Sequence, residues 1–192
     1  MTYLILGLLI FLGVHSFRMV AEGWRGQATA QMGENAYKGI FSLLSAVGLG
    51  LIIWGFGLAR QAPVMVWLPP AGMRHVTGVL VLVAFVLVTA AYVPGNAIKA
   101  RLHHPMVLGV KTWAFAHLLS NGSWAGIVLF GAFLAWSVVL FAASRRRDRE
   151  QHTQYPPGRT APTAVTALVG VGAWALFAFA LHGMLIGIRP LG

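Results

Sequence analysis

Apolar segments long enough to cross a lipid bilayer recur along this chain and decide what it can fold into. A helix needs roughly 20 apolar residues to span a hydrocarbon core about 30 Å thick. Apolar segments of 14 to 26 residues cover residues 4–17, 34–59, 72–93, 105–121, 124–144 and 163–188. The sequence therefore predicts an all-α integral membrane protein, a six-transmembrane-helix bundle that forms a single domain over residues 1–192.

The composition agrees with a lipid environment. Hydrophobic residues make up 58% of the chain and charged residues only 9%, which is too little polar surface to cover a water-soluble fold. The formal charge of +10 would suggest nucleic acid in a soluble protein, but the cations here lie between apolar segments, where topology explains them. We therefore predict the lipid bilayer as a partner and no nucleic acid. Because the chain contains no cysteine, thiolate metal sites and thioether-linked haem are excluded.

The distribution of Lys and Arg predicts the orientation of the helices. Ten of the 14 lie in or beside the connectors after the first, third and fifth segments, three lie at the opposite ends, and Lys111 lies inside the fourth segment. Connectors rich in Lys and Arg stay in the cytoplasm, so both termini are predicted on the outer face. A signal peptide begins with positive charge, whereas no cation precedes the first apolar run, so we expect that run to be a transmembrane helix.

The fourth segment holds polar residues at a depth where ionisable groups are costly unless they serve a function. Lys111 follows His104 by seven residues and shares its helix face, whereas His117 follows by thirteen and faces about 140° away. His104 and His117 therefore cannot bind one metal. His182 in the sixth segment lies near the depth of His117, because these segments run parallel, and His15 lies near the end of the first segment. Histidines in a membrane bind cofactors or only hydrogen-bond neighbouring helices, and both interpretations stay open here.

Several short motifs follow one another over nearly the whole chain. They are Gly13-Val14-His15, Gly33-Glu34-Asn35-Ala36-Tyr37-Lys38-Gly39, Ile53-Trp54-Gly55, Trp67-Leu68-Pro69-Pro70, Arg74-His75, His104-Pro105-Met106 and Ala116-His117-Leu118-Leu119-Ser120-Asn121-Gly122. As a set, they resemble the NnrU family. The resemblance implies a protein of the bacterial inner membrane that is associated with denitrification and nitric oxide metabolism. The family usually has Arg-His-Pro where this chain has His103-His104-Pro105, so a role of that arginine in anchoring an anionic group does not carry over.

A relative of this family, zeta-carotene isomerase, is a haem b protein, and the resemblance implies His15 and His117 as the haem ligands. Helix geometry only partly agrees, because these histidines are offset by roughly 10 Å along antiparallel helices. His182 differs from His117 in depth by about 4 Å and is the alternative partner. We also predict that His104 and Lys111 contribute to cofactor binding, unless Lys111 only extends to the membrane surface. In that role Lys111 would bind an anionic group such as a haem propionate.

Several classes of function remain open. The first is a haem b membrane protein of nitrogen-oxide metabolism, with a small nitrogen oxide or a lipophilic molecule as its ligand. The second is a haem-dependent cis-trans isomerase of a lipophilic polyene such as zeta-carotene, with Trp54, Met106, Trp113 and Phe115 lining an apolar groove. The third is a channel or assembly factor without a cofactor. A membrane methyltransferase is more remote, because the arginine of the Arg-His-Pro motif is replaced.

Overall fold

The computed structural model describes residues 1–20, 27 and 29–191, and every regular element in that part of the chain is a helix. Contacts between Cα atoms divide the chain into two compact units. The first comprises Met1–Trp67 and Ser123–Ala132, and the second comprises Leu68–Gly122 and Phe133–Gly192. Of the connector predicted for residues 18–33, residues 21–26 and 28 lie outside the described part of the chain.

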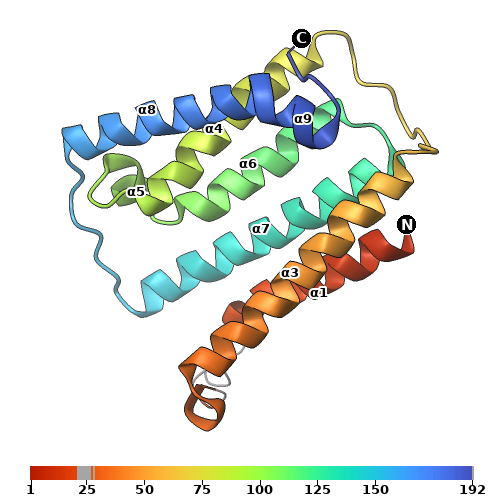
Figure 1. Cartoon of the computed structure of the whole chain (residues 1–192). Coiled ribbons are helices and arrows are strands. Elements are labelled where there is room, and N and C mark those ends of the chain that lie inside the picture. The colour runs from red at the N-terminus through yellow and green to blue at the C-terminus, as the bar shows by residue number, and fades with distance from the viewer. Residues whose placement is uncertain (21–26, 28, 192) are drawn as a thin grey trace. The chain divides into compact units, whose positions relative to one another are not determined.

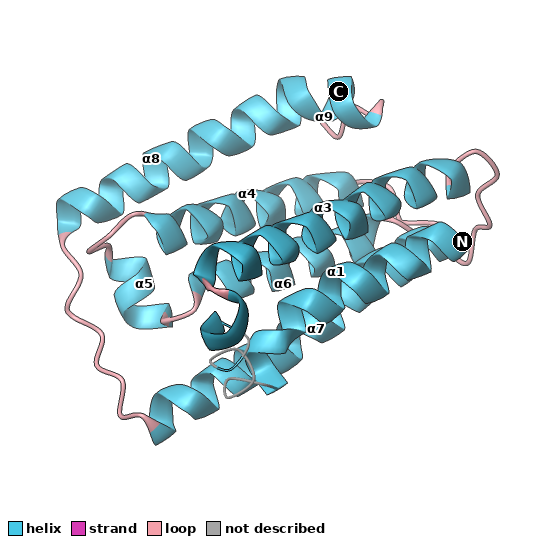
Figure 2. Cartoon of the chain, turned by 60° about the horizontal axis from the view of Figure 1, so that its bottom comes forward, coloured by secondary structure: helices cyan, strands magenta, loops and turns pink. Residues whose placement is uncertain are grey.

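In the first unit, helix α1 (Thr2–Val20) packs against helix α3 (Glu34–Ala59), as Figures 1 and 2 show. The pair is antiparallel, because Gly55 near the end of α3 meets Leu4 near the start of α1. A Cβ on Gly55 would lie only 2.3 Å from the Leu4 nitrogen, so the absence of a side chain lets the backbones touch. Small residues at such crossings are how membrane helices pack closely.

In the second unit, helix α4 (Met73–Tyr92) lies between helix α6 (Pro105–Ser120) and helix α8 (Thr160–Leu176) (Figure 1). Both neighbours present a glycine to it. An added Cβ on Gly109 of α6 or on Gly170 of α8 would lie 2.8 Å or 2.7 Å from the nearest α4 atom. Helix α4 is therefore the centre of this unit, and its neighbours approach it at backbone distance.

A short helix, α5 (Ala97–Leu102), connects α4 to α6. Its N-cap Asn96 is only 1% exposed and accepts a hydrogen bond from the backbone nitrogen of Lys99 at 2.8 Å. The Asn96 amide also donates to the carbonyl oxygens of Ala90 and Val93 at 2.9 Å and 2.5 Å. One side chain thus caps the new helix and satisfies carbonyls at the end of the preceding one.

Helix α7 (Trp124–Glu150) continues past the apolar segment predicted for residues 124–144 and through the charged run that follows. Arg and Glu are good helix formers, and Arg146 pairs with Glu150 at four-residue spacing, 3.6 Å apart. The connector between α7 and α8 is therefore shorter than the predicted loop of residues 145–162 and covers residues 151–159 (Figure 1).

The sixth predicted segment contains a π-helical turn that the sequence does not reveal. Helix α8 passes into the π turn η1 (Phe177–Leu181), and α9 (His182–Ile186) completes the helix. Gly187 ends it in the left-handed conformation, with φ of 78°. Glycine adopts this conformation without a steric penalty, which is why it often follows the last helical residue.

Within the described part of the chain, four helices are long and apolar enough to cross a membrane. They are Glu34–Ala59, Met73–Tyr92, Trp124–Glu150 and Thr160–Ile186. All six predicted segments are helical, but the apolar stretch Thr2–Ser16 of α1 is shorter, and the 16 residues of α6 span roughly 24 Å at 1.5 Å per residue. The predicted all-helical class is confirmed, and the count of six membrane-spanning helices stays a prediction.

Candidate functional site

His117 lies in the last turn of α6 among aromatic side chains. Its Nδ1 is 2.9 Å from the carbonyl oxygen of Trp113, one helical turn earlier, and the two rings are 5.2 Å apart. The Trp113 ring also meets Phe133 of α7 edge to face. Thr77 of α4 donates its hydroxyl to the carbonyl oxygen of Ala116 at 3.0 Å. Ring contacts and main-chain bonds thus hold both the helix and the imidazole in place.

His182 begins α9 directly after the π turn Phe177–Leu181. Its Nδ1 is 2.6 Å from the carbonyl oxygen of Ile188, and the Phe177 ring meets the imidazole edge to face at 5.8 Å. Single π turns inside α-helices are frequent at functional sites. His182 and His117 belong to the same unit.

His15 lies on α1 in the first unit. Its Nδ1 is 2.7 Å from the carbonyl oxygen of Phe11, and the rings of Phe11 and Phe41 lie 4.2 Å and 5.2 Å from the imidazole. His117 and His182 also place Nδ1 on a main-chain carbonyl. A carbonyl can only accept, so Nδ1 carries the hydrogen in all three, and Nε2 carries the lone pair when the ring is neutral.

The structure gives His104 a different partner. Its Nε2 is 2.8 Å from Oδ2 of Asp148 on α7. The His104 ring meets Phe141 of α7 edge to face, and the Lys111 Nζ lies 5.8 Å from the centre of the same Phe141 ring. The helix face that His104 and Lys111 share therefore points toward α7. Lys111 forms no ion pair with a described acidic residue.

Asp148 is the centre of a polar cluster that the sequence analysis did not identify. The Tyr155 hydroxyl donates to Asp148 Oδ2 at 3.2 Å, and the His103 Nδ1 lies 3.9 Å from the same oxygen. The His103 ring stacks on the Tyr155 ring, with centroids 4.0 Å apart and planes 8° apart. Arg145 donates a hydrogen bond to the Nδ1 of His103. The sequence signal that could have pointed to this cluster is Asp148 itself, the single acidic residue inside the basic run 145–149.

The charges in this cluster stabilise one another. Burial disfavours the charged Asp148 carboxylate, but the hydrogen bond and charge of His104 and the hydrogen bond from Tyr155 outweigh it, so the pKa of this carboxyl lies below its ordinary value. Burial, followed by the charge of Asp148, raises the pKa of Tyr155. The cluster ties the start of α6 to the end of α7 and to the connector 151–159. His104 is therefore engaged in a structural contact.

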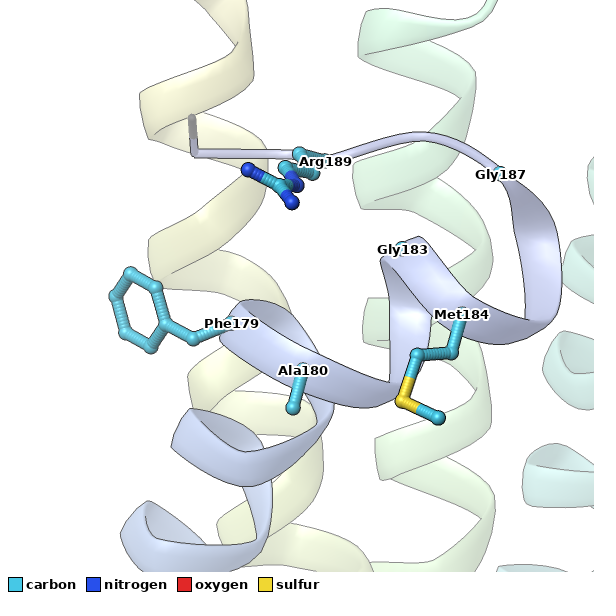
Figure 3. A pocket seen from close by; sticks show the side chains of 6 residues that line it. All are labelled: Phe179, Ala180, Gly183, Met184, Gly187 and Arg189. Carbon is cyan, nitrogen blue, oxygen red and sulfur yellow. The ribbon is translucent and has the colours of Figure 1, made fainter.

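A surface pocket of about 370 Å³ lies at the C-terminal turn (Figure 3). Its lining residues are Phe179, Ala180, Gly183, Met184, Gly187 and Arg189. None of the five predicted cofactor-binding residues is among them, and neither are the side chains predicted to line an apolar groove, which are Trp54, Met106, Trp113 and Phe115. The pocket therefore does not identify the predicted site.

The donor set decides which kind of metal centre the described residues can form. No group of three or more His, Asp or Glu side chains among them is close enough to hold a metal ion. A haem iron takes four ligands from the porphyrin and needs only one or two from the protein. Haem ligation therefore does not require such a group.

Comparison with known proteins identifies a family for nearly the whole chain. A family model described as NnrU protein matches residues 3–190. No curated protein and no solved structure matches the chain.

Proposed function

The chain belongs to the NnrU family, and from this premise we propose that it is a bacterial inner-membrane protein that binds haem b and acts in nitrogen-oxide metabolism. Four helices of sufficient length and apolarity support the membrane location. We propose that α1 and α6 complete a set of six spans, with both termini on the outer face. The excess of Lys and Arg in the connectors after the first, third and fifth segments supports this orientation.

The observation that carries the haem proposal is the geometry common to His15, His117 and His182. Each places Nδ1 on a main-chain carbonyl. Histidines that ligate metals almost always donate their other ring N–H to a carbonyl or carboxylate, which fixes the tautomer and makes the ligating nitrogen more basic. Nε2 is then the nitrogen that would bind the iron. When bound, the haem would supply a redox-active iron whose potential depends on these axial ligands.

His117 belongs to both candidate ligand pairs. His182 is a candidate partner because both histidines lie in the second unit and differ in depth by about 4 Å on helix rise. His15 is favoured by the resemblance to the haem-binding relative and by the matching bond of its Nδ1 to a carbonyl one turn earlier.

Alanine variants of the three histidines test ligation. With two neutral imidazoles on the iron, the ferric protein should be low-spin, and His117→Ala should lose haem or its low-spin spectrum. Of His15→Ala and His182→Ala, the one that removes an axial ligand should give high-spin or depleted haem, and the other should change affinity only mildly. His75→Ala, which removes an exposed histidine from the first turn of α4, is the matched control. Low-spin haem in all variants would contradict histidine ligation.

Lys111 is the candidate contact for a haem propionate. It lies within α6 and has no acidic partner among the described residues, whereas Asp148 already engages His104. A half-buried cation without a counter-charge is costly within a membrane segment, so an anionic group nearby would stabilise it. Lys111→Met should transfer haem to apomyoglobin faster than the wild type does, and Lys111→Arg should restore slow transfer. If haem transfer from Lys111→Met were unchanged, Lys111 would not bind the haem and would only extend to the membrane interface. The control is Lys38→Met, which removes a lysine that forms an exposed ion pair with Glu34.

A further inference from the structure

The connector between α3 and α4 is apolar and exposed. No residue between Arg60 and Arg74 is charged. Five consecutive apolar side chains in it have large exposed fractions, which are 68% for Val64, 49% for Met65, 56% for Val66, 37% for Trp67 and 79% for Leu68. Soluble proteins rarely expose such a continuous apolar patch to water. Water is therefore a poor environment for this stretch.

The position of the connector in the chain points to the membrane surface. It follows α3 and precedes α4, and both helices are long and apolar enough to cross a bilayer. The connector between two such helices emerges where they leave the hydrocarbon. Arg60 and Arg74 at its ends suit the level of lipid phosphates, and Trp67 is a residue type enriched at membrane interfaces. Sequence and topology thus place the apolar patch next to lipid.

The backbone sets how deep the connector can lie. Irregular backbone exposed to lipid is not tolerated in the hydrocarbon core, because unpaired N–H and C=O groups are costly there. Here Pro63, Pro69 and Pro70 have no N–H to satisfy. The carbonyl oxygen of Val64 accepts a hydrogen bond from the backbone nitrogen of Trp124 at 2.8 Å. These features lower the cost of removing the connector from water. Its remaining polar groups still need water or headgroups to bind them, which favours the boundary region over the hydrocarbon core.

We propose that residues 63–70 lie at the boundary between headgroups and acyl chains, on the side of the membrane where α3 ends and α4 begins. Val64, Val66 and Leu68 are more exposed than Met65 and Trp67, so the three even-numbered side chains face the lipid. The partner of this surface is the lipid bilayer, and the inference rests on the membrane location proposed above.

The chain contains no cysteine, so single-cysteine variants can carry one spin label each without a background. Val64→Cys, Val66→Cys and Leu68→Cys would be labelled in protein reconstituted into phosphatidylcholine–phosphatidylglycerol nanodiscs. Gln154→Cys in the exposed polar connector is the aqueous reference, and Leu168→Cys, which is 74% exposed in α8, is the hydrocarbon reference. The relative collision rates of each label with oxygen and with a water-soluble nickel chelate report depth.

The three labels should report depths between those of the two references, and Met65→Cys should collide with oxygen less often than its neighbours do. Values equal to those of Gln154→Cys at all three positions would place the connector in water and overturn the inference. Labels shielded from both reagents would mean that protein covers the patch, which also overturns it. If Leu168→Cys were itself aqueous, the membrane location would fail as well, so the two failures are distinguishable.

Discussion

Replacing Asp148 by asparagine should destabilise the protein through the cluster that joins α6, α7 and the connector 151–159. One carboxylate oxygen of Asp148 accepts hydrogen bonds from His104 at 2.8 Å and from Tyr155 at 3.2 Å. Asparagine has a similar shape and keeps one acceptor oxygen, so the variant removes mainly the negative charge. The effect therefore isolates the electrostatic part of the cluster.

The size of the effect follows from these contacts. Hydrogen bonds to charged groups contribute about 1.5–3 kcal/mol, against about 1 kcal/mol for neutral ones. The side chains of His104 and Asp148 are only 18% and 14% exposed, so water screens them incompletely. The Tyr155 bond is longer and contributes at the lower end. Asp148→Asn should thus lower the free energy of unfolding by about 1–2 kcal/mol, and Asp148→Ala by more.

The pH dependence has a defined sign. Because the pKa of Asp148 is lowered in the folded state, its contribution is fully present above the unfolded-state pKa of about 3.8 and is lost as pH falls through the lower folded-state pKa. Unfolding by a denaturing detergent, followed by near-ultraviolet circular dichroism, would measure both effects. The wild type should lose stability over this acidic range, and Asp148→Asn should lose less.

The control for this prediction is Glu150→Gln, which removes the same charge from the same helix end. Glu150 is 66% exposed, and its pair with Arg146 is 3.6 Å long, so we expect a change below about 0.5 kcal/mol. Equal effects of Asp148→Asn and Glu150→Gln would refute the reasoning, because net charge alone would then explain the loss.

Three further predictions concern the fold. Asn96→Ala removes three hydrogen bonds at a buried site and should lower the free energy of unfolding by about 2–3 kcal/mol. Asn96→Ser keeps the helix cap and should recover about 1 kcal/mol of this loss. Gly158→Ala should lower the Tm strongly, because its Cβ would lie 2.1 Å from the Ala97 Cα, whereas Gly172→Ala has open space and should not. Compartment reporters fused at Gly158 and at Gly192 should report opposite sides of the membrane, and agreement between them would contradict the proposed orientation.

The positions of the long helices could be predicted because burial in lipid depends on the local run of apolar residues. The short helix α5 could not, because it depends on Asn96, which caps it through Lys99 and also bonds back to the carbonyl oxygen of Ala90. The π turn before His182 has no signal in composition either, since one extra residue in a helical turn leaves the apolar pattern nearly unchanged.

The candidate site was predictable to a similar extent. The shared face of His104 and Lys111 follows from helix geometry, and the structure directs both toward one Phe141 ring. The partner of His104 did not follow, because Asp148 is 44 residues away in the sequence, and no helical rule connects them. The tautomers of the histidines likewise depend on which carbonyl each Nδ1 meets.

The most direct test of the account is the visible spectrum of the wild-type protein purified from haem-replete cells. The account predicts a low-spin ferric Soret band, with haem that acid solvents extract completely because no cysteine can bind it covalently. His117→Ala, purified in parallel, should lose this band or its low-spin form. A wild-type protein without Soret absorption, both as purified and after addition of haem, would contradict the central claim.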